Sequence, residues 1–173
     1  STVKTVNGKK PVFFGLDAKN DFYAKNIKNS GDGKVLATLC FDNNNIDVEI
    51  PAIGTYMVTN ALAAAAAGNL LGLTDEEIAN GVASYQTVGS RANVINTGKI
   101  KIIDDCYNAN PTSVRASLDT LSNLDGRKVA ILGDMKELGS EELKLHFDTG
   151  VYAKSKDIGT VITVGELAKE LAK

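Results

Sequence analysis

KIKIIDDCYNANPTSVRASLDTL, residues 99–121, decides the fold, because a strand, a polar loop and a helix follow one another within it. The apolar residues at its start predict a strand over residues 99–104. Asn110 and Pro111 predict the start of a helix, since asparagine caps free N–H groups and proline loses no hydrogen bond at the first helical position. A strand that leads through a loop into a helix is the repeating unit of an α/β fold.

The rest of the second half alternates in the same way. Strands are predicted at residues 92–96, 128–132 and 159–164, and helices at 141–154, capped by Ser140, and from Glu166 onward. This alternation predicts a parallel sheet with helices on its faces, which is a Rossmann-like α/β domain. The sequence stops after few strands, so this domain is expected to be incomplete.

The first half is predicted to hold a mixed sheet followed by two helices. Strands are predicted at 11–15, 34–41 and 45–50, and helices at 56–71 and from Thr74. The turn residues 42–44 predict a hairpin between the last two strands, and Gly72 ends the first helix. Thr74 and Glu77 form a capping box at the start of the second helix. The segment 31–34 lacks the spacing of a phosphate-binding loop and precedes a strand, so it is predicted to be a turn.

The turn-forming residues 87–90 mark the predicted boundary, which gives one domain over 1–88 and a second over 89–173. A net charge of -2 and a pI near 5.4 give no electrostatic basis for nucleic-acid binding. Two distant cysteines argue against a disulfide framework or a structural zinc site and favour the cytoplasm. The longest apolar run, 61–67, is too short to span a bilayer, so no membrane insertion is expected.

Two polar loops follow predicted strands, where ligands gather in open α/β sheets. In the first, 104–110, the paired acids Asp104 and Asp105 suit a ribose, a metal-bound water or a cation, and an Asx-rich turn that caps its own helix is equally compatible. The second, 133–139, either lines a small-molecule pocket or is an ordinary connection. Cys106 has no histidine near it in sequence, so it is expected to fill space.

Arg91 lies at the predicted domain junction, where its guanidinium would suit a phosphate or carboxylate, or else form a surface ion pair. His146, the only histidine, lies beside an apolar stripe formed by Leu143, Phe147 and Val151. A packing role on the flank of the helix is therefore expected for His146 rather than a catalytic one.

Four segments together resemble the Mur ligase family in order and spacing. They are GTYMVTNALAA at 54–64, GSR at 89–91, IDDCYNANP at 103–111 and LGDMKELG at 132–139. The last two are similar to the branch that joins D-alanyl-D-alanine to UDP-N-acetylmuramoyl-tripeptide in peptidoglycan synthesis. The resemblance implies that ATP phosphorylates the terminal carboxylate of the tripeptide and that the dipeptide amine attacks the acyl phosphate. It also implies Mg²⁺ as a cofactor, with ligands mostly outside this chain.

The resemblance further implies roles for matching residues. Asn60 resembles the asparagine beside the adenine. Arg91 resembles the arginine that reaches the ATP phosphates and assists catalysis, and Asp105 the aspartate that binds the ribose. Three residues would face the incoming dipeptide: Asn108, Asn110 and Asp134.

The chain also departs from the family pattern. Tyr56 replaces a frequent histidine, and the phosphate-binding loop, the acidic magnesium ligand and the modified lysine of the family are absent. No metal ligand is therefore assigned, and the chain by itself is expected to be inactive. The alternatives are another Mur ligase or a folylpolyglutamate synthase-like ligase, or a non-catalytic module that binds a nucleotide or peptide.

Overall fold

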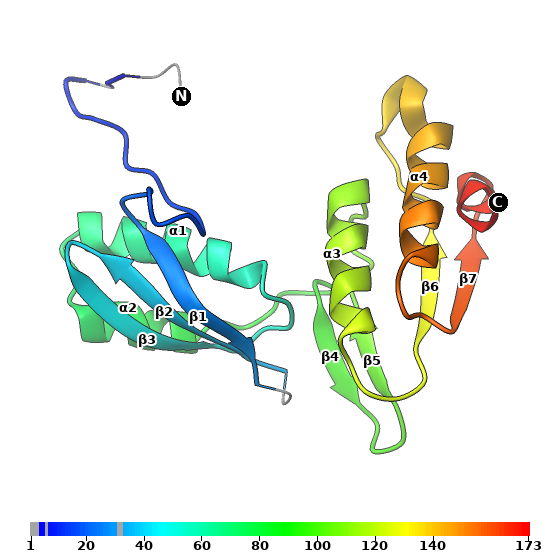
Figure 1. Ribbon diagram of the computed structural model, residues 1–173, viewed down its shortest axis with the longest axis horizontal. Coiled ribbons are helices and arrows are strands. Elements are labelled where there is room, and N and C mark those ends of the chain that lie inside the picture. Colours follow the sequence, from blue (N-terminus) through cyan, green and yellow to red (C-terminus); the bar gives the residue numbers. More distant parts are fainter. Residues whose placement is uncertain (1–3, 6, 31–32) are drawn as a thin grey trace. The chain divides into compact units, whose positions relative to one another are not determined.

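The structure is a computed structural model that describes all residues except 1–3, 6 and 31–32. The chain forms two compact units, Ser1–Gln86 and Thr87–Lys173 (Figure 1). Each unit has its own sheets and helices, so each is described by itself. The turn predicted at 31–34 lies partly outside the described residues.

The first unit contains a three-stranded antiparallel sheet in the order β1 (Tyr23–Asn29), β2 (Val35–Phe41) and β3 (Asn44–Ile50). Asp42 and Asn43 join β2 to β3, both with positive φ (46° and 64°), as a tight hairpin turn requires. The predicted hairpin is thereby confirmed. The strand predicted at 11–15 is wrong, since only Phe14 makes a single bridge, to Phe22, and β1 was missed.

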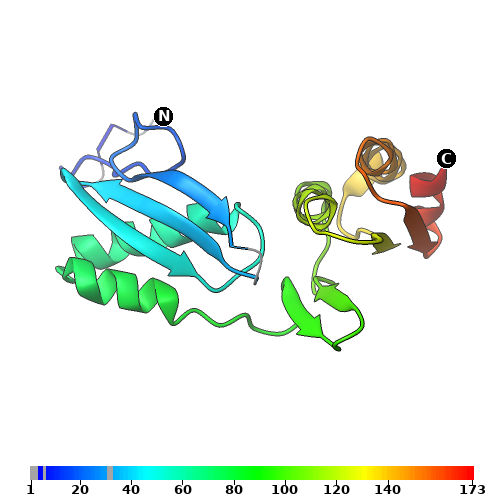
Figure 2. The ribbon, with the colours of Figure 1, turned by 60° about the horizontal axis from the view of Figure 1, so that its bottom comes forward.

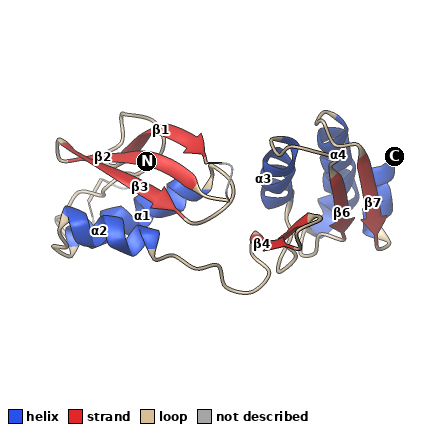
Figure 3. Cartoon of the chain, turned by 90° about the horizontal axis from the view of Figure 1, so that it is seen from below, coloured by secondary structure: helices blue, strands red, loops and turns tan. Residues whose placement is uncertain are grey.

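Two helices, α1 (Met57–Leu70) and α2 (Asp75–Ala83), cover one face of this sheet (Figures 2 and 3). The core between them includes Val35 and Leu39 of β2 and Val58 and Leu62 of α1, each at 0% exposure. On β3 every second residue from Ile46 to Ile50 is buried, because successive side chains point to opposite faces. Alternating exposure on this strand was predicted from its sequence.

The connection between α1 and α2 follows local sequence rules. Gly72 has φ 85°, the left-handed conformation that ends α1. The Thr74 hydroxyl accepts a hydrogen bond from the Glu77 amide (3.2 Å), and the Glu77 carboxylate accepts one from the Thr74 amide (2.8 Å). The predicted capping box is therefore confirmed.

The second unit contains two separate two-stranded sheets. β4 (Asn93–Asn96) and β5 (Lys101–Asp104) pair antiparallel, whereas β6 (Val129–Gly133) and β7 (Thr160–Val164) pair parallel. The prediction that all these strands share one parallel sheet is wrong for β4 and β5. Their connection is only four residues long, and a parallel crossover needs a dozen or more.

Helices α3 (Pro111–Ser122) and α4 (Glu142–Lys154) pack against each other and on one face of the parallel pair (Figure 1). Leu118, Ala130 and Ala153 form their buried core. The Tyr152 hydroxyl of α4 donates to both carboxylate oxygens of Asp119 on α3 (2.7 and 2.8 Å). This contact fixes the two helices side by side.

Three predictions for the second unit need correction. Ser140 does not cap α4, because Gly139–Glu141 (η1) forms a short 3-10 turn before the helix. The final segment, Leu167–Ala172 (η2), is also 3-10 rather than α-helical. The apolar stripe of α4 is exposed, whereas His146 is fully buried, so His146 lies on the inner face of the helix.

Candidate functional site

Arg91 lies on a turn that the loop after β5 holds in place. The amide of Tyr107 donates to the Ser90 carbonyl (3.1 Å), and the amide of Ala92 donates to the Asp105 carboxylate (3.0 Å). Ala92 has φ 51°, which is uncommon for a residue with a Cβ. One hydrogen bond on each side of Arg91 therefore fixes the backbone of this turn. The bond at Ala92 also holds that residue in a left-handed conformation that alanine seldom adopts.

The Arg91 side chain lies over the ring of Tyr107, with Cζ 4.3 Å from the ring centroid. This is a cation–π contact, which uses the face of the guanidinium and not its edge. Among the residues that the structure describes, Arg91 makes no hydrogen bond or ion pair, and it is exposed. Its N–H donors therefore remain available to an anion such as a phosphate or a carboxylate.

Asp105 connects three elements of the second unit. One carboxylate oxygen accepts from the Ala92 amide before β4, and the other accepts from the Ser117 hydroxyl on α3. A carboxylate oxygen can accept more than one hydrogen bond, so a ligand hydroxyl can still be bound. The sequence did not predict this structural role, because Ala92 and Ser117 lie 13 and 12 residues away. The ribose role of Asp105 stays a prediction.

Asp104 is kept charged by its neighbours. The Cys106 thiol donates to its carboxylate (3.1 Å), and this bond, followed by that of the Ser90 hydroxyl, lowers the pKa of Asp104. Cys106 is exposed, so the expectation that it fills space is wrong. Its neighbours in the turn, and not the core, determine its contacts.

Asn108 and Asn110 play different parts in the same loop. The Asn110 side chain accepts hydrogen bonds from the amides of Thr112 and Ser113, both at 3.0 Å, and so begins α3 as predicted. Asn108 is exposed and makes no hydrogen bond with any residue in the described part of the chain. Of the two amides, Asn108 is therefore the freer to bind a ligand, and substrate binding by either stays a prediction.

Asp134 lies in the loop after β6, which makes no hydrogen bond to the 104–110 loop among the described residues. One carboxylate oxygen accepts from the Ala168 amide at the start of η2 (2.8 Å), and the other lies 3.0 Å from the Lys136 ammonium. The Ala168 bond first, and the Lys136 contact second, lower the pKa of Asp134. Asp134 is thus ionised and already engaged, while Lys136 and Glu137 face solvent.

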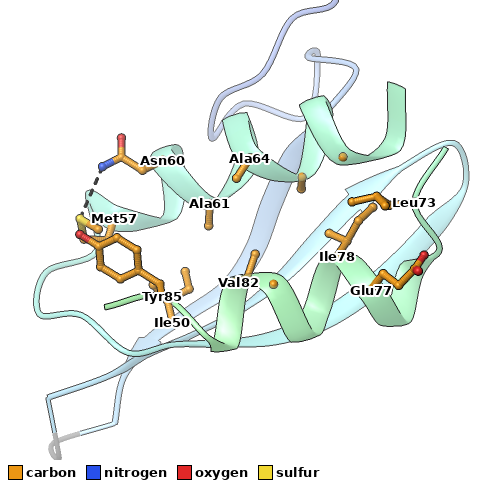
Figure 4. Close-up of a pocket in the computed structure, with 13 residues that line it drawn as sticks. Ile50, Met57, Asn60, Ala61, Ala64, Leu73, Glu77, Ile78, Val82 and Tyr85 are labelled. Carbon is orange, nitrogen blue, oxygen red and sulfur yellow. Dashed lines mark hydrogen bonds between the residues drawn. The ribbon is translucent and has the colours of Figure 1, made fainter. Parts of the chain in front are cut away.

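Asn60 lies in the first unit, on the exposed side of α1 at one end of a pocket of about 360 Å³ between α1 and α2 (Figure 4). Its amide is 3.5 Å from the Met57 sulfur, and Tyr85 lies at the same end of the pocket. The walls combine larger apolar side chains, such as Ile50, Ile78 and Val82, with small residues: Ala61, Ala64, Ala65, Gly68 and Gly81. The pocket is therefore apolar, with the Asn60 amide as a polar group at its rim.

The described residues contain no group of three or more histidine, cysteine, aspartate or glutamate side chains placed to hold a metal ion. No magnesium ligand is therefore assigned among these residues, and no chemical step is placed on a metal. No helix in the described part has the length and apolar character needed to cross a bilayer.

The second unit thus presents an exposed arginine on a fixed turn and two polar loops after strands of an α/β fold, which is an arrangement suited to an anionic ligand. Two family models match the chain: the Mur ligase middle domain over residues 2–68, and the Mur ligase glutamate ligase domain over residues 90–173. The chain belongs to the Mur ligase family.

Three similar proteins are named as ligases of this family or as MurF. The UDP-N-acetylmuramoyl-tripeptide–D-alanyl-D-alanine ligase of Bacillus subtilis (strain 168) is 33% identical over 163 residues, covering 92% of this chain and 35% of the relative. A crystal structure of MurF from Acinetobacter baumannii has a TM-score of 0.89 at 31% identity, covering 95% and 36% of the two chains. MurF ligase from Thermotoga maritima, solved with ADP, has a TM-score of 0.82 at 27% identity, covering 94% and 38%.

The chain spans about a third of the length of these relatives. The fold class predicted from the four resembling segments is confirmed, since the structure matches the MurF structure from Acinetobacter baumannii over 95% of the chain.

Proposed function

We propose that the full-length protein is an ATP-dependent ligase that adds D-alanyl-D-alanine to UDP-N-acetylmuramoyl-tripeptide in peptidoglycan synthesis. The relatives of that name support this proposal. The observation that carries it is the position of the Arg91 side chain. Its guanidinium is held over Tyr107, while its N–H donors remain free for an anion within the described part of the chain. A ligase that forms an acyl phosphate needs such a cation.

Each candidate residue has a distinct part in this proposal. Arg91 offsets negative charge on the ATP phosphates as it develops during transfer. Asp105 binds the ribose while it holds the Arg91 turn, and Asn60 lies beside the adenine. Asn108, Asn110 and the Asp134 loop contact the dipeptide. The magnesium ion that the family implies would add further positive charge at the phosphates, and its ligands are expected mostly outside this chain.

The two units correspond, in this proposal, to parts of two Mur ligase domains. Residues 1–88 form a portion of the central ATP-binding domain, and residues 89–173 form a portion of the C-terminal ligase domain. The two family models support this, because one ends at residue 68 and the other begins at residue 90. We further propose a cytoplasmic location, which the two free cysteines support.

Phosphate release by the full-length protein tests the function directly. ATP, magnesium, UDP-N-acetylmuramoyl-tripeptide and D-alanyl-D-alanine are supplied together, and each is then omitted in turn. Release that requires both peptide substrates is expected. Release with folate and glutamate, or with a single amino acid, would move the protein to another ligase of the same fold. Nucleotide binding without release under any condition would favour the non-catalytic module.

Arg91→Ala tests the residue that carries the proposal. A hydrogen bond to a charged group is worth roughly 1.5–3 kcal/mol, so we expect turnover to fall by about one to two decades with folding unchanged. Arg127→Ala, which removes another exposed arginine of the same unit, is the matched control. Equal turnover in both variants would remove Arg91 from the site.

A further inference from the structure

His146 is the only histidine in the chain, and its side chain on α4 is completely buried. A buried imidazole needs a partner for each ring nitrogen. Nε2 lies 2.9 Å from the backbone nitrogen of Met135, and Nδ1 lies 2.7 Å from the carbonyl oxygen of Glu142. Both ring nitrogens therefore bind the backbone, one within α4 and one in the loop after β6.

These two partners determine where the ring proton lies. The Met135 amide can only donate, so Nε2 accepts and carries no proton. The Glu142 carbonyl can only accept, so Nδ1 donates to it. The ring is consequently neutral and protonated on Nδ1 in this arrangement. A proton on Nε2 would face the Met135 N–H and break the bond.

The Met135 bond holds one side of the loop 133–139. The Met135 side chain is itself buried, with 1% exposure, and the preceding residue, Asp134, binds the Ala168 amide on the other side of the loop. The loop is thus attached to α4 through His146 and to η2 through Asp134. Lys136 and Glu137 follow directly and are exposed, with Glu137 at φ 62°.

We propose that His146 is a positioning residue, which fixes the 133–139 loop through the Met135 amide so that this loop meets the dipeptide substrate in one conformation. The imidazole touches no substrate and transfers no proton in the reaction. Volume alone would not achieve this, because an apolar residue of similar size would fill the cavity and leave the Met135 amide without an acceptor. The link to the dipeptide rests on the proposed function. The hydrogen bond between His146 and the Met135 amide, called the clamp below, does not.

The tautomer can be tested without any substitution. Long-range ¹H–¹⁵N correlation spectra of the chain contain a single imidazole, so the assignment is unambiguous. The pattern of a neutral ring protonated on Nδ1 is expected, because Nε2 accepts from the Met135 amide and Nδ1 faces the Glu142 carbonyl. A ring protonated on Nε2, or on both nitrogens, would overturn the proposal.

Hydrogen exchange at the Met135 amide tests the clamp. His146→Leu fills the volume without an acceptor, and His146→Gln restores a carbonyl oxygen on a side chain of similar reach. We expect the Met135 amide to exchange at least about tenfold faster in the leucine variant and to recover part of its protection in the glutamine variant. Equal protection in all three proteins would show that His146 only fills space.

The kinetic arm uses the full-length enzyme. His146→Leu is expected to raise KM for D-alanyl-D-alanine about tenfold and to leave KM for ATP unchanged, with partial recovery in His146→Gln. An equal change in every KM, or none, would overturn the positioning role. If the wild-type protein shows no ligase activity, the proposed function fails by itself, and the spectra and exchange rates still decide whether the clamp exists.

Discussion

At the scale of single residues, the ring of Tyr107 provides the surface on which the Arg91 guanidinium rests. A cation–π contact at an exposed site is worth roughly 0.5–1 kcal/mol. We therefore expect Tyr107→Leu in the full-length enzyme to lower kcat/KM about two- to fivefold. Tyr107→Phe keeps the ring and is expected to behave as the wild type. Equal losses in both variants would mean that the hydroxyl, and not the ring face, matters.

Asp134 gives a prediction for the pH dependence of stability. Its pKa in the folded chain lies below the ordinary value of 3.8, because the Ala168 amide and Lys136 favour the carboxylate. The stabilisation is thus fully present above pH 3.8 and is lost as the pH falls through the lower folded pKa. Melting temperatures measured through this range should fall more steeply for the wild type than for Asp134→Asn.

The control for this prediction is Asp125→Asn, which changes an exposed aspartate that makes no hydrogen bond with the described residues. Its melting temperature is expected to follow the wild-type curve. If the Asp134→Asn protein showed the same pH dependence as the wild type, the contact of Asp134 with the Ala168 amide would not contribute to stability in solution.

At the scale of elements, Gly165 joins β7 to η2 where Asp134 approaches the backbone. A Cβ at this position would overlap the Asp134 carboxylate. We expect Gly165→Ala to lower the free energy of unfolding by about 1–3 kcal/mol more than a glycine substitution in open space. Gly126→Ala is the control, since Gly126 also has positive φ (92°) and no atom near its Cβ position. Equal melting curves for the two variants would show that the loop moves away from the added Cβ with no loss in the free energy of unfolding.

The sequence predicted those elements whose ends depend on neighbouring residues. Thr74 with Glu77 and Asn110 with Pro111 place helix starts correctly, because each cap satisfies amides within three residues of it. Ser140 was a wrong cap for the same kind of signal, since the 3-10 turn at Gly139–Glu141 moved the helix start. A capping residue can be recognised from the local sequence, but tertiary packing determines whether the helix begins at that residue.

At the scale of the whole molecule, the two units have unequal cores among the described residues. The first has eighteen buried residues in one apolar cluster, and the second has three. Buried apolar area is the main stabilising term, so the second unit should open at lower denaturant concentration. In hydrogen exchange measured by mass spectrometry across a urea series, the amides of β6 are expected to lose protection at a lower urea concentration than those of β2. Simultaneous release of both strands would show that the chain unfolds as a single cooperative unit.

The candidate site was predictable only where its members are close in sequence. The 103–111 and 132–139 segments were identified from their residues, and so was Arg91. The link from Asp105 to Ala92 and the bond from His146 to Met135 were not, because each joins residues more than ten positions apart. Periodicity and capping signals extend only a few residues along the chain.

The sequence by itself determined the capped helices, the β2–β3 hairpin and the family, because these depend on local backbone chemistry and on ordered motifs. Only the tertiary structure decided that β4 and β5 form their own antiparallel sheet, that Tyr107 supports Arg91, and that His146 is buried against the loop after β6. The physical reason is that burial and long-range hydrogen bonds depend on which elements pack together, and no single segment contains that information.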